Sequence, residues 1–305
     1  MTPPATHPSA IRIGISGWRY VPWRGTFYPD DLPQAQELTY ASHQVPTIEI
    51  NGTFYSLQRP EWFARWRDAT PPGFMFSVKG TRFITHRLRL RDIETPLANF
   101  LASGLFELQE KLGPILWQFP PSMRFDPERF ERFLSLLPGD THAAARLAAR
   151  HDQRMAGRAA LDPGPRRPVR HAVEIRHDSF ACAEFVQMLR AHNVALVTAD
   201  TAGKWPLLED ATADFAYLRL HGDKELYASG YTDDALRRWA SRIRAWSRGK
   251  EPRDARRAGP RPGRAYGARD VYCYFDNDIK VKAPGDARTL ARLLDLPLAP
   301  VEPPQ

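Results

Sequence analysis

The sequence predicts an α/β protein of the (β/α)8 TIM-type barrel class. Short β-rich runs alternate with helical patterns along the chain, which is typical of βα units and a parallel sheet. Eight such runs can be recognised, and nearly all are followed by a helical pattern. The length of 305 residues suits a closed barrel, which commonly needs about 250. An open, doubly wound sheet is the alternative fold.

The predicted strands are apolar runs rich in β-branched and aromatic residues. They lie at 11–16, 47–51, 74–79, 115–119, 171–176, 195–200, 215–221 and 270–276. Helical patterns occur at 33–43, 59–69, 97–111, 127–137, 180–192, 232–247 and 285–295. Only residues 200–214 lack a convincing helix. We expect one barrel domain at 11–298, after a disordered N-terminal tail at 1–10.

Composition narrows the class of protein. No run of about 18 apolar residues occurs, so we expect no membrane-spanning helix. The N-terminal residues lack the apolar segment of a secretory signal. The two cysteines, Cys182 and Cys273, have neither metal-type spacing nor a disulfide framework. These features favour a cytoplasmic protein with no membrane partner.

The positive charge of the chain is concentrated in two segments. The net charge is +8, but residues 139–171 carry +4 and residues 247–269 carry +6, so the remainder is slightly negative. Each segment follows a helix and precedes a strand, which in a barrel places it at the N-terminal face. Solvated basic insertions are therefore the favoured interpretation, and a nucleic-acid or acidic-partner surface is the alternative.

Polar pairs occur where the predicted strands end. Residues two apart on a strand point to the same side. Charged groups on apolar strands are costly to bury unless they are paired or face a cleft. The pairs are Glu49 with Asn51, Ser77 with Lys79, Glu174 with Arg176, Thr198 with Asp200, and Arg219 with His221, while Gln118 stands alone. Their recurrence predicts a functional site at the C-terminal face.

Seven motifs resemble those of the domain-of-unknown-function-72 (YecE-like) family, in order, from about residue 11 to 295. They read GISGWRYVPWRGTFYP, IEINGTFYSL, FSVKGTRFITH, LGPILWQFPP, AVEIRHDSF, YLRLHG and VYCYFDND. The resemblance implies a TIM barrel but no established reaction. Two departures are Asp276, where the family usually has Asn, and the segment IKVKAPGDA that follows. The two basic insertions are also larger than the usual connections.

Three cations near the strand ends suit a phosphate or carboxylate group. They are Lys79, Arg176 and Arg219. Lys79 is a candidate catalytic residue, either as an electrophile or as an anion-binding cation. Its structural alternative is an ion pair with Glu49 or Glu174. His221 is a candidate proton shuttle, or a histidine merely hydrogen-bonded in the barrel mouth.

Glu49 and Glu174 are candidate acid/base groups, as in glycoside hydrolysis. They could instead belong to a metal site with His221, Asp200 or His177, or Glu174 could simply pair with Arg176 or Lys79. No HxxH or HExxH spacing is present, so no cofactor is predicted and a divalent metal stays an open alternative. The remaining substrate-binding candidates are Trp18, Asn51, Tyr55, Gln118, Asp200, Tyr231 and Asn277.

Aromatic residues such as Trp18 and Tyr55 near the strand ends suit sugar rings or nucleobases. The leading hypothesis is an enzyme that uses acid/base chemistry on an anionic, phosphorylated or sugar-containing small molecule. A nucleic-acid binding or processing protein and a non-catalytic, ligand-binding barrel are the alternatives.

Overall fold

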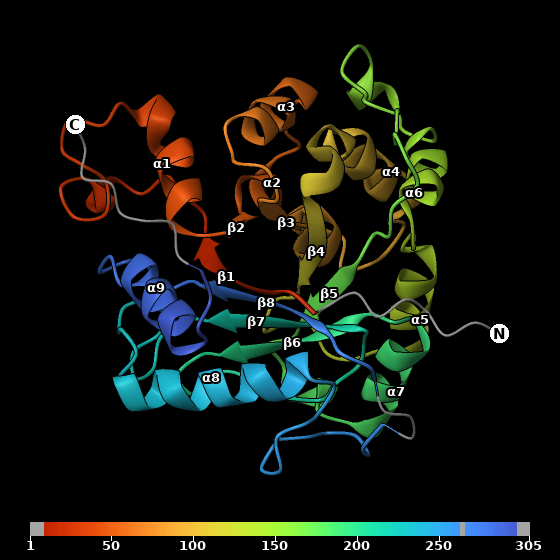
Figure 1. Ribbon diagram of the computed structural model, residues 1–305. Coiled ribbons are helices and arrows are strands. Elements are labelled where there is room, and N and C mark those ends of the chain that lie inside the picture. Colours follow the sequence, from red (N-terminus) through yellow and green to blue (C-terminus); the bar gives the residue numbers. More distant parts are fainter. Residues whose placement is uncertain (1–8, 263–265, 298–305) are drawn as a thin grey trace.

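Eight parallel strands close into a barrel (Figure 1). The computed structural model describes residues 9–262 and 266–297. Most of the predicted N-terminal tail, residues 1–8, and residues 263–265 of the second basic insertion lie outside the described residues. Each strand pairs with the next, and the last pairs with the first. The (β/α)8 prediction is confirmed, and the open sheet is excluded because β8 pairs with β1 and closes the barrel.

The strands lie close to their predicted positions. They are β1 (Ile11–Ser16), β2 (Thr47–Ile50), β3 (Met75–Lys79), β4 (Leu112–Gln118), β5 (His171–Glu174), β6 (Ala195–Asp200), β7 (Phe215–Leu220) and β8 (Asp270–Phe275). Several predicted strand-end residues lie just beyond the last residue of their strand. Asn51 follows β2, Arg176 follows β5, and His221 follows β7. Their side chains therefore extend the polar positions of the strands into the loops at the C-terminal face.

Helices surround the barrel (Figure 1). They are α1 (Glu37–Gln44), α2 (Gly52–Tyr55), α3 (Pro60–Asp68), α4 (Glu94–Ala102), α5 (Pro127–Leu136), α6 (Thr141–Ala148), α7 (Ala183–Ala191), α8 (Asp233–Ser247) and α9 (Ala283–Leu293). Several begin at side-chain caps, as where Thr232 accepts the backbone N–H of Ala235 before α8. Within the described residues, none of these helices is long and apolar enough to cross a membrane. As predicted, none lies between β6 and β7.

The helical pattern at 97–111 is two pieces rather than one helix. α4 ends at Ala102, and a 3-10 segment, η4 (Leu105–Lys111), follows. Gly104 between them has φ of 121°, a conformation that favours glycine. A Cβ atom at this position would lie 2.6 Å from the Cα of Pro60. The helix therefore ends before Gly104, where α3 comes close to the chain. The spacing of apolar residues over 97–111 does not reveal this contact.

The barrel interior is apolar at one end and polar at the other. A buried cluster fills the N-terminal part, and it includes Ala195, Val197, Phe215, Tyr217, Tyr272 and Tyr274. Farther along the same inward-facing rows lie Ser16, Glu49, Glu174 and Arg219, all essentially inaccessible to solvent. A barrel presents its inward-facing residues in such layers. The charged layer therefore forms the floor of the C-terminal face.

The two basic insertions join helices to strands and so lie at the N-terminal end. The first contains α6, which packs against α4. The second runs below the barrel toward α7 in Figure 1. It is tied to the β6–β7 connection, because the Asp210 carboxylate accepts the backbone N–H groups of Ala258 and Gly259 over 2.8 and 3.0 Å. The charges of these insertions are therefore separated from the C-terminal face by the length of the barrel.

Candidate functional site at the C-terminal ends of the strands

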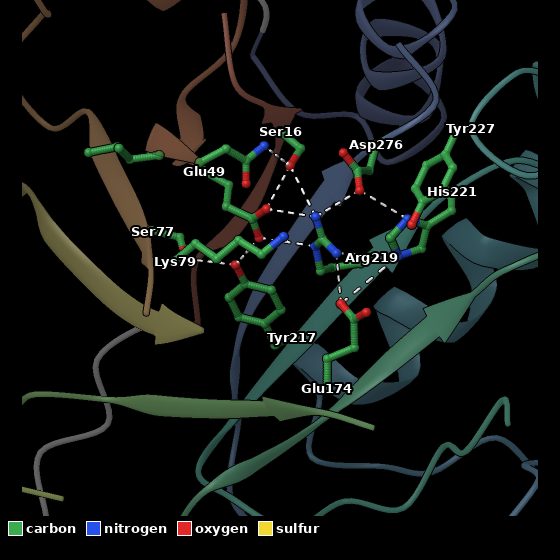
Figure 2. Close-up of polar contacts among 12 residues, drawn as sticks. Ser16, Glu49, Ser77, Lys79, Glu174, Tyr217, Arg219, His221, Tyr227 and Asp276 are labelled. Carbon is green, nitrogen blue, oxygen red and sulfur yellow. Dashed lines mark hydrogen bonds and ion pairs between the residues drawn. The ribbon is translucent and has the colours of Figure 1, made fainter. Parts of the chain in front are cut away.

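One buried guanidinium organises the floor of the site (Figure 2). Arg219, at the end of β7, is fully buried. It forms ion pairs with Glu49 over 2.9 Å, with Glu174 over 2.7 Å and with Asp276 over 2.8 Å. Burial alone lowers the pKa of Arg219, but these carboxylates raise it well above its usual value. Arg219 is thus permanently charged. Its three carboxylate partners come from β2, from β5 and from the loop after β8.

Two of the carboxylates around Arg219, those of Glu174 and Asp276, are held as anions. Burial raises the pKa of Glu174, but the charges of Arg219 and Arg176 reverse the shift and hold it well below its usual range. The pKa of Asp276 is likewise lowered, against its burial, by Arg219 and His221. Glu49 also accepts a hydrogen bond of 2.6 Å from Ser16 Oγ. The network is therefore a fixed electrostatic platform at neutral pH.

Arg176 stands at the edge of this platform. Its Nε donates to Glu174 Oε1 over 2.9 Å, and its Nη2 donates to the hydroxyl of Tyr227 over 3.2 Å. The guanidinium lies over the ring of Trp205, 3.8 Å from the ring centre. These contacts orient a planar cation, whose remaining N–H groups can bind an anion in bidentate fashion.

Lys79, the last residue of β3, is a buried amine without a carboxylate partner. The residue is only 8% exposed. None of the ion pairs among the described residues includes it, because Arg219 takes the three nearby carboxylates. Its Nζ lies 4.5 Å from the centre of the Phe54 ring. Burial and the charge of Arg219 lower the pKa of Lys79 to about 8, although the neighbouring carboxylates oppose the shift.

A cavity of about 1020 Å³ opens above the platform. Six of the residues predicted from the sequence line it: Trp18, Asn51, Tyr55, Lys79, Gln118 and Arg176. Further lining residues include Tyr20, Trp62, Trp66, His86, Asp276 and Asp278. The cavity is therefore bounded by aromatic rings, cations and carboxyl groups, and it has room for a phosphorylated sugar or a compound of similar size.

Two further titratable groups line the same cavity. Burial, reinforced by the charge of Asp276, raises the pKa of Asp278 to about 6. Burial, reinforced by the charges of Arg176 and Lys79, lowers the pKa of His86 to about 4. At neutral pH the imidazole of His86 is thus uncharged. The pKa of Asp278 lies close enough to neutral pH for its carboxyl group to donate or accept a proton during a reaction.

The family described as "Protein of unknown function DUF72" matches residues 12–305. The chain belongs to this family. The UPF0759 protein YecE of Escherichia coli (strain K12) is 30% identical over 146 residues, 47% of this chain and 49% of that protein. The UPF0759 protein YunF of Bacillus subtilis (strain 168) is 28% identical over 116 residues, 36% of this chain and 40% of that protein. The chain spans about half the length of the curated relatives it matches.

Crystal structures of two DUF72 proteins have the same fold. The protein from Thermotoga maritima MSB8 has a TM-score of 0.70 and 24% identity, with 94% of this chain and 99% of that chain covered. A protein from Enterococcus faecalis V583 has a TM-score of 0.66 and 17% identity, with 97% and 99% covered. At these identities the likeness concerns the fold alone.

Besides Arg219, three of the predicted substrate-binding residues do not line the cavity of this DUF72 barrel. Asp200 accepts a hydrogen bond of 3.2 Å from Tyr231, and Tyr231 is 8% exposed. Asn277 is fully buried, and its Nδ2 donates to Asp286 over 2.8 Å. On β6 the side chains of Ala195, Val197 and Ala199 point into the barrel. Asp200, which follows Ala199, therefore points outward.

Four other predicted residues form the platform beneath the cavity. Glu49, Glu174, Arg219 and His221 are fully buried, and none belongs to the cavity lining. The Nδ1 atom of His221 lies 3.0 Å from Asp276 Oδ2. Among the described residues, no group of three or more His, Cys, Asp or Glu side chains is placed to hold a metal ion. Glu49 and Glu174 instead bracket the Arg219 guanidinium.

Sequence reasoning overlooked several lining residues. Tyr272 and Tyr274 on β8 point into the barrel. Successive side chains of a strand point to opposite sides, so Asp276, two residues after Tyr274, points inward as well and lines the cavity. This alternation can be recognised in the sequence, and it favours Asp276 over Asn277 as a residue of the site. His86 and Trp62 lie in helical segments after strands, where no strand parity applies. Only the packing of these segments brings the two side chains to the cavity.

Proposed function

We propose that this protein is an enzyme that uses acid/base chemistry on an anionic, ring-containing small molecule bound in the C-terminal cavity. The observation that carries the proposal is Lys79, a nearly buried amine that lines the cavity without an ion-pair partner among the described residues. An unpaired buried lysine is costly to folding, so it is expected where a reaction needs it.

The lining residues suggest how the work is divided. Arg176 holds the anionic group, because its guanidinium is oriented by Glu174 and Trp205. The aromatic side chains of Trp18, Tyr55 and Trp62 offer surfaces for a ring. Lys79 and Asp278, whose pKa values are about 8 and about 6, serve as proton-transfer groups. Glu49, Glu174 and Arg219 are then positioning residues.

Ligand binding tests the anion part of this proposal. Glucose 6-phosphate and ribose 5-phosphate should raise the melting temperature of the wild-type protein, whereas glucose and ribose should not. Arg176→Gln should abolish the shift. Arg237→Gln, at an exposed arginine on α8, is the matched control and should keep it. Equal stabilisation by neutral sugars, or full binding by Arg176→Gln, would contradict the proposal.

Turnover tests the enzyme part. Wild-type protein is incubated with the compounds that stabilise it, and the mixtures are followed by ³¹P NMR and mass spectrometry. Conversion that is lost in Lys79→Met is the expected result. Tight binding without conversion of any stabilising compound would favour the non-catalytic barrel instead. The basic insertions do not enter this test, because they lie at the opposite end of the barrel.

A further inference from the structure

The Lys79 amine differs from a structural lysine in its surroundings. A lysine that stabilises a barrel is expected to pair with a carboxylate, and three carboxylates lie in the layer beneath it. Arg219 occupies all three of them. The Lys79 Nζ lies 4.5 Å from the centre of the Phe54 ring, and Lys79 lines the open cavity. Figure 2 shows the amine directed toward the Arg219 platform, and Lys79 also lines the cavity in which a ligand would sit.

The charge balance of the site makes both forms of the amine accessible. Two guanidinium groups, of Arg176 and Arg219, face three carboxylates, of Glu49, Glu174 and Asp276. Among these five groups and Lys79, a protonated amine brings the sum to zero and a neutral amine leaves a single negative charge. Asp278 in the same cavity adds a further negative charge above about pH 6. With a pKa of about 8, roughly a tenth of the amine is unprotonated at pH 7. An unprotonated lysine in a desolvated site beside a second cation is a nucleophile.

We propose that Lys79 forms a Schiff base with the carbonyl carbon of an anionic carbonyl compound, such as a sugar phosphate in its open form or an oxo acid. This inference rests on the proposed function and names its substrate class. Arg176 lines the same cavity and binds the anionic group, which leaves the carbonyl group to face Lys79. The cavity volume of about 1020 Å³ admits a compound of this size.

The reaction needs only the carbonyl compound and a proton. The lone pair of the Lys79 nitrogen forms the C–N bond while the carbonyl π electrons move to oxygen. A proton leaves nitrogen and one is added to that oxygen, which gives a carbinolamine. A further proton on the hydroxyl group allows the C–O bond to break, so water leaves and a C=N⁺ iminium remains. Asp278 lines the same cavity, and its raised pKa of about 6 keeps a fraction of its carboxyl group protonated near neutral pH, so it can donate this proton.

Reductive trapping tests the Schiff base. The full chain is incubated at pH 7.5 with sodium cyanoborohydride and one of three probes: dihydroxyacetone phosphate, ribose 5-phosphate or pyruvate. Intact mass and peptide mapping should show one adduct, on Lys79, with at least one probe. Lys79→Arg keeps the charge but not the nucleophile and should reduce the yield at least tenfold. Lys280→Arg, at an exposed lysine, is the matched control and should not change it.

Several outcomes would overturn the inference. They are adducts spread over exposed lysines, an unchanged yield in a folded Lys79→Arg protein, and an equal yield with neutral dihydroxyacetone. The melting temperature of Lys79→Arg establishes that it is folded. If sugar phosphates stabilise the wild type through Arg176 but no probe is trapped, the Schiff base is wrong and the proposed function stands. If neither binding nor trapping occurs, both are wrong.

Discussion

Arg219 and Glu174 form the shortest ion pair around the buried guanidinium, with Nη1 2.7 Å from Oε2 and neither side chain accessible to solvent. Replacing Arg219 by Met would leave Glu49, Glu174 and Asp276 buried beside one another without their common cation. We expect the free energy of unfolding to fall by about 3–5 kcal/mol. Urea unfolding followed by tryptophan fluorescence measures the loss.

Arg237→Met on α8 serves as the control for that loss, because the Arg237 side chain is 60% exposed. Its effect should stay within about 0.5 kcal/mol. An Arg219→Met protein as stable as the control would show that the three carboxylates do not depend on Arg219.

The Lys79 amine should titrate near pH 8. Only the unprotonated amine reacts with acetic anhydride, so its labelling rate rises as the pH passes through the pKa. Peptide mapping after short labelling pulses from pH 6 to pH 11 should place the midpoint about two units below the value of about 10.4 for an ordinary lysine. The exposed Lys250 provides the internal reference. A Lys79 rate that still increases steeply above pH 10 would contradict the structure.

Asp276→Asn should lower the pKa of Lys79 further. The negative charge of Asp276 raises the pKa of Lys79 and also that of Asp278. Its removal therefore favours the neutral amine and the ionised Asp278 carboxylate. We expect the midpoint of Lys79 labelling to fall by about one unit. Asp254→Asn, at an exposed ion pair in the second basic insertion, should leave the midpoint where it is. An upward shift in Asp276→Asn would contradict the charge assignment.

His171 should make the protein sensitive to acid. Its Nδ1 accepts from Trp117 over 3.1 Å, and its Nε2 lies 2.9 Å from the carbonyl oxygen of Pro138, so the neutral Nε2–H tautomer satisfies both contacts. Burial lowers the pKa of His171 to about 4 from 6.5. Between pH 4 and pH 6.5 the unfolded chain binds more protons at His171 than the folded protein does. The contribution of the neutral imidazole to the free energy of unfolding is therefore fully present above about pH 6.5 and is lost as the pH falls toward 4.

The loss at His171 should reach about 3 kcal/mol near pH 4. Urea unfolding from pH 7 to pH 4 measures it by comparing wild type with His171→Gln, which keeps a donor and an acceptor but does not titrate. The comparison also removes the contribution of His86, which is present in both proteins. His142→Gln, at an exposed histidine, should retain the wild-type pH dependence. Parallel pH profiles for wild type and His171→Gln would refute the prediction.

Much of the candidate site follows from local patterns. In several predicted strands, polar residues alternate with apolar ones near the C-terminal end. This alternation predicts which side chains face the interior of a barrel. By this pattern Lys79 and Gln118 face the interior, and both line the cavity. It fails on β6, because the row that carries Thr198 and Asp200 faces outward, whereas the apolar row of Ala195, Val197 and Ala199 faces the barrel interior. The predicted site also includes Asn277, although the alternation along β8 favours Asp276.

The sequence by itself determined the barrel, its eight strands and the polar layer at the C-terminal ends. The tertiary structure alone decided which charges in that layer are paired. Glu49, Glu174 and Asp276 come from three different parts of the chain, and only the closure of the barrel brings them to one guanidinium. Because Arg219 can donate several hydrogen bonds at once, it holds all three carboxylates. The amine of Lys79, which lines the cavity, is left without an ion pair among the described residues.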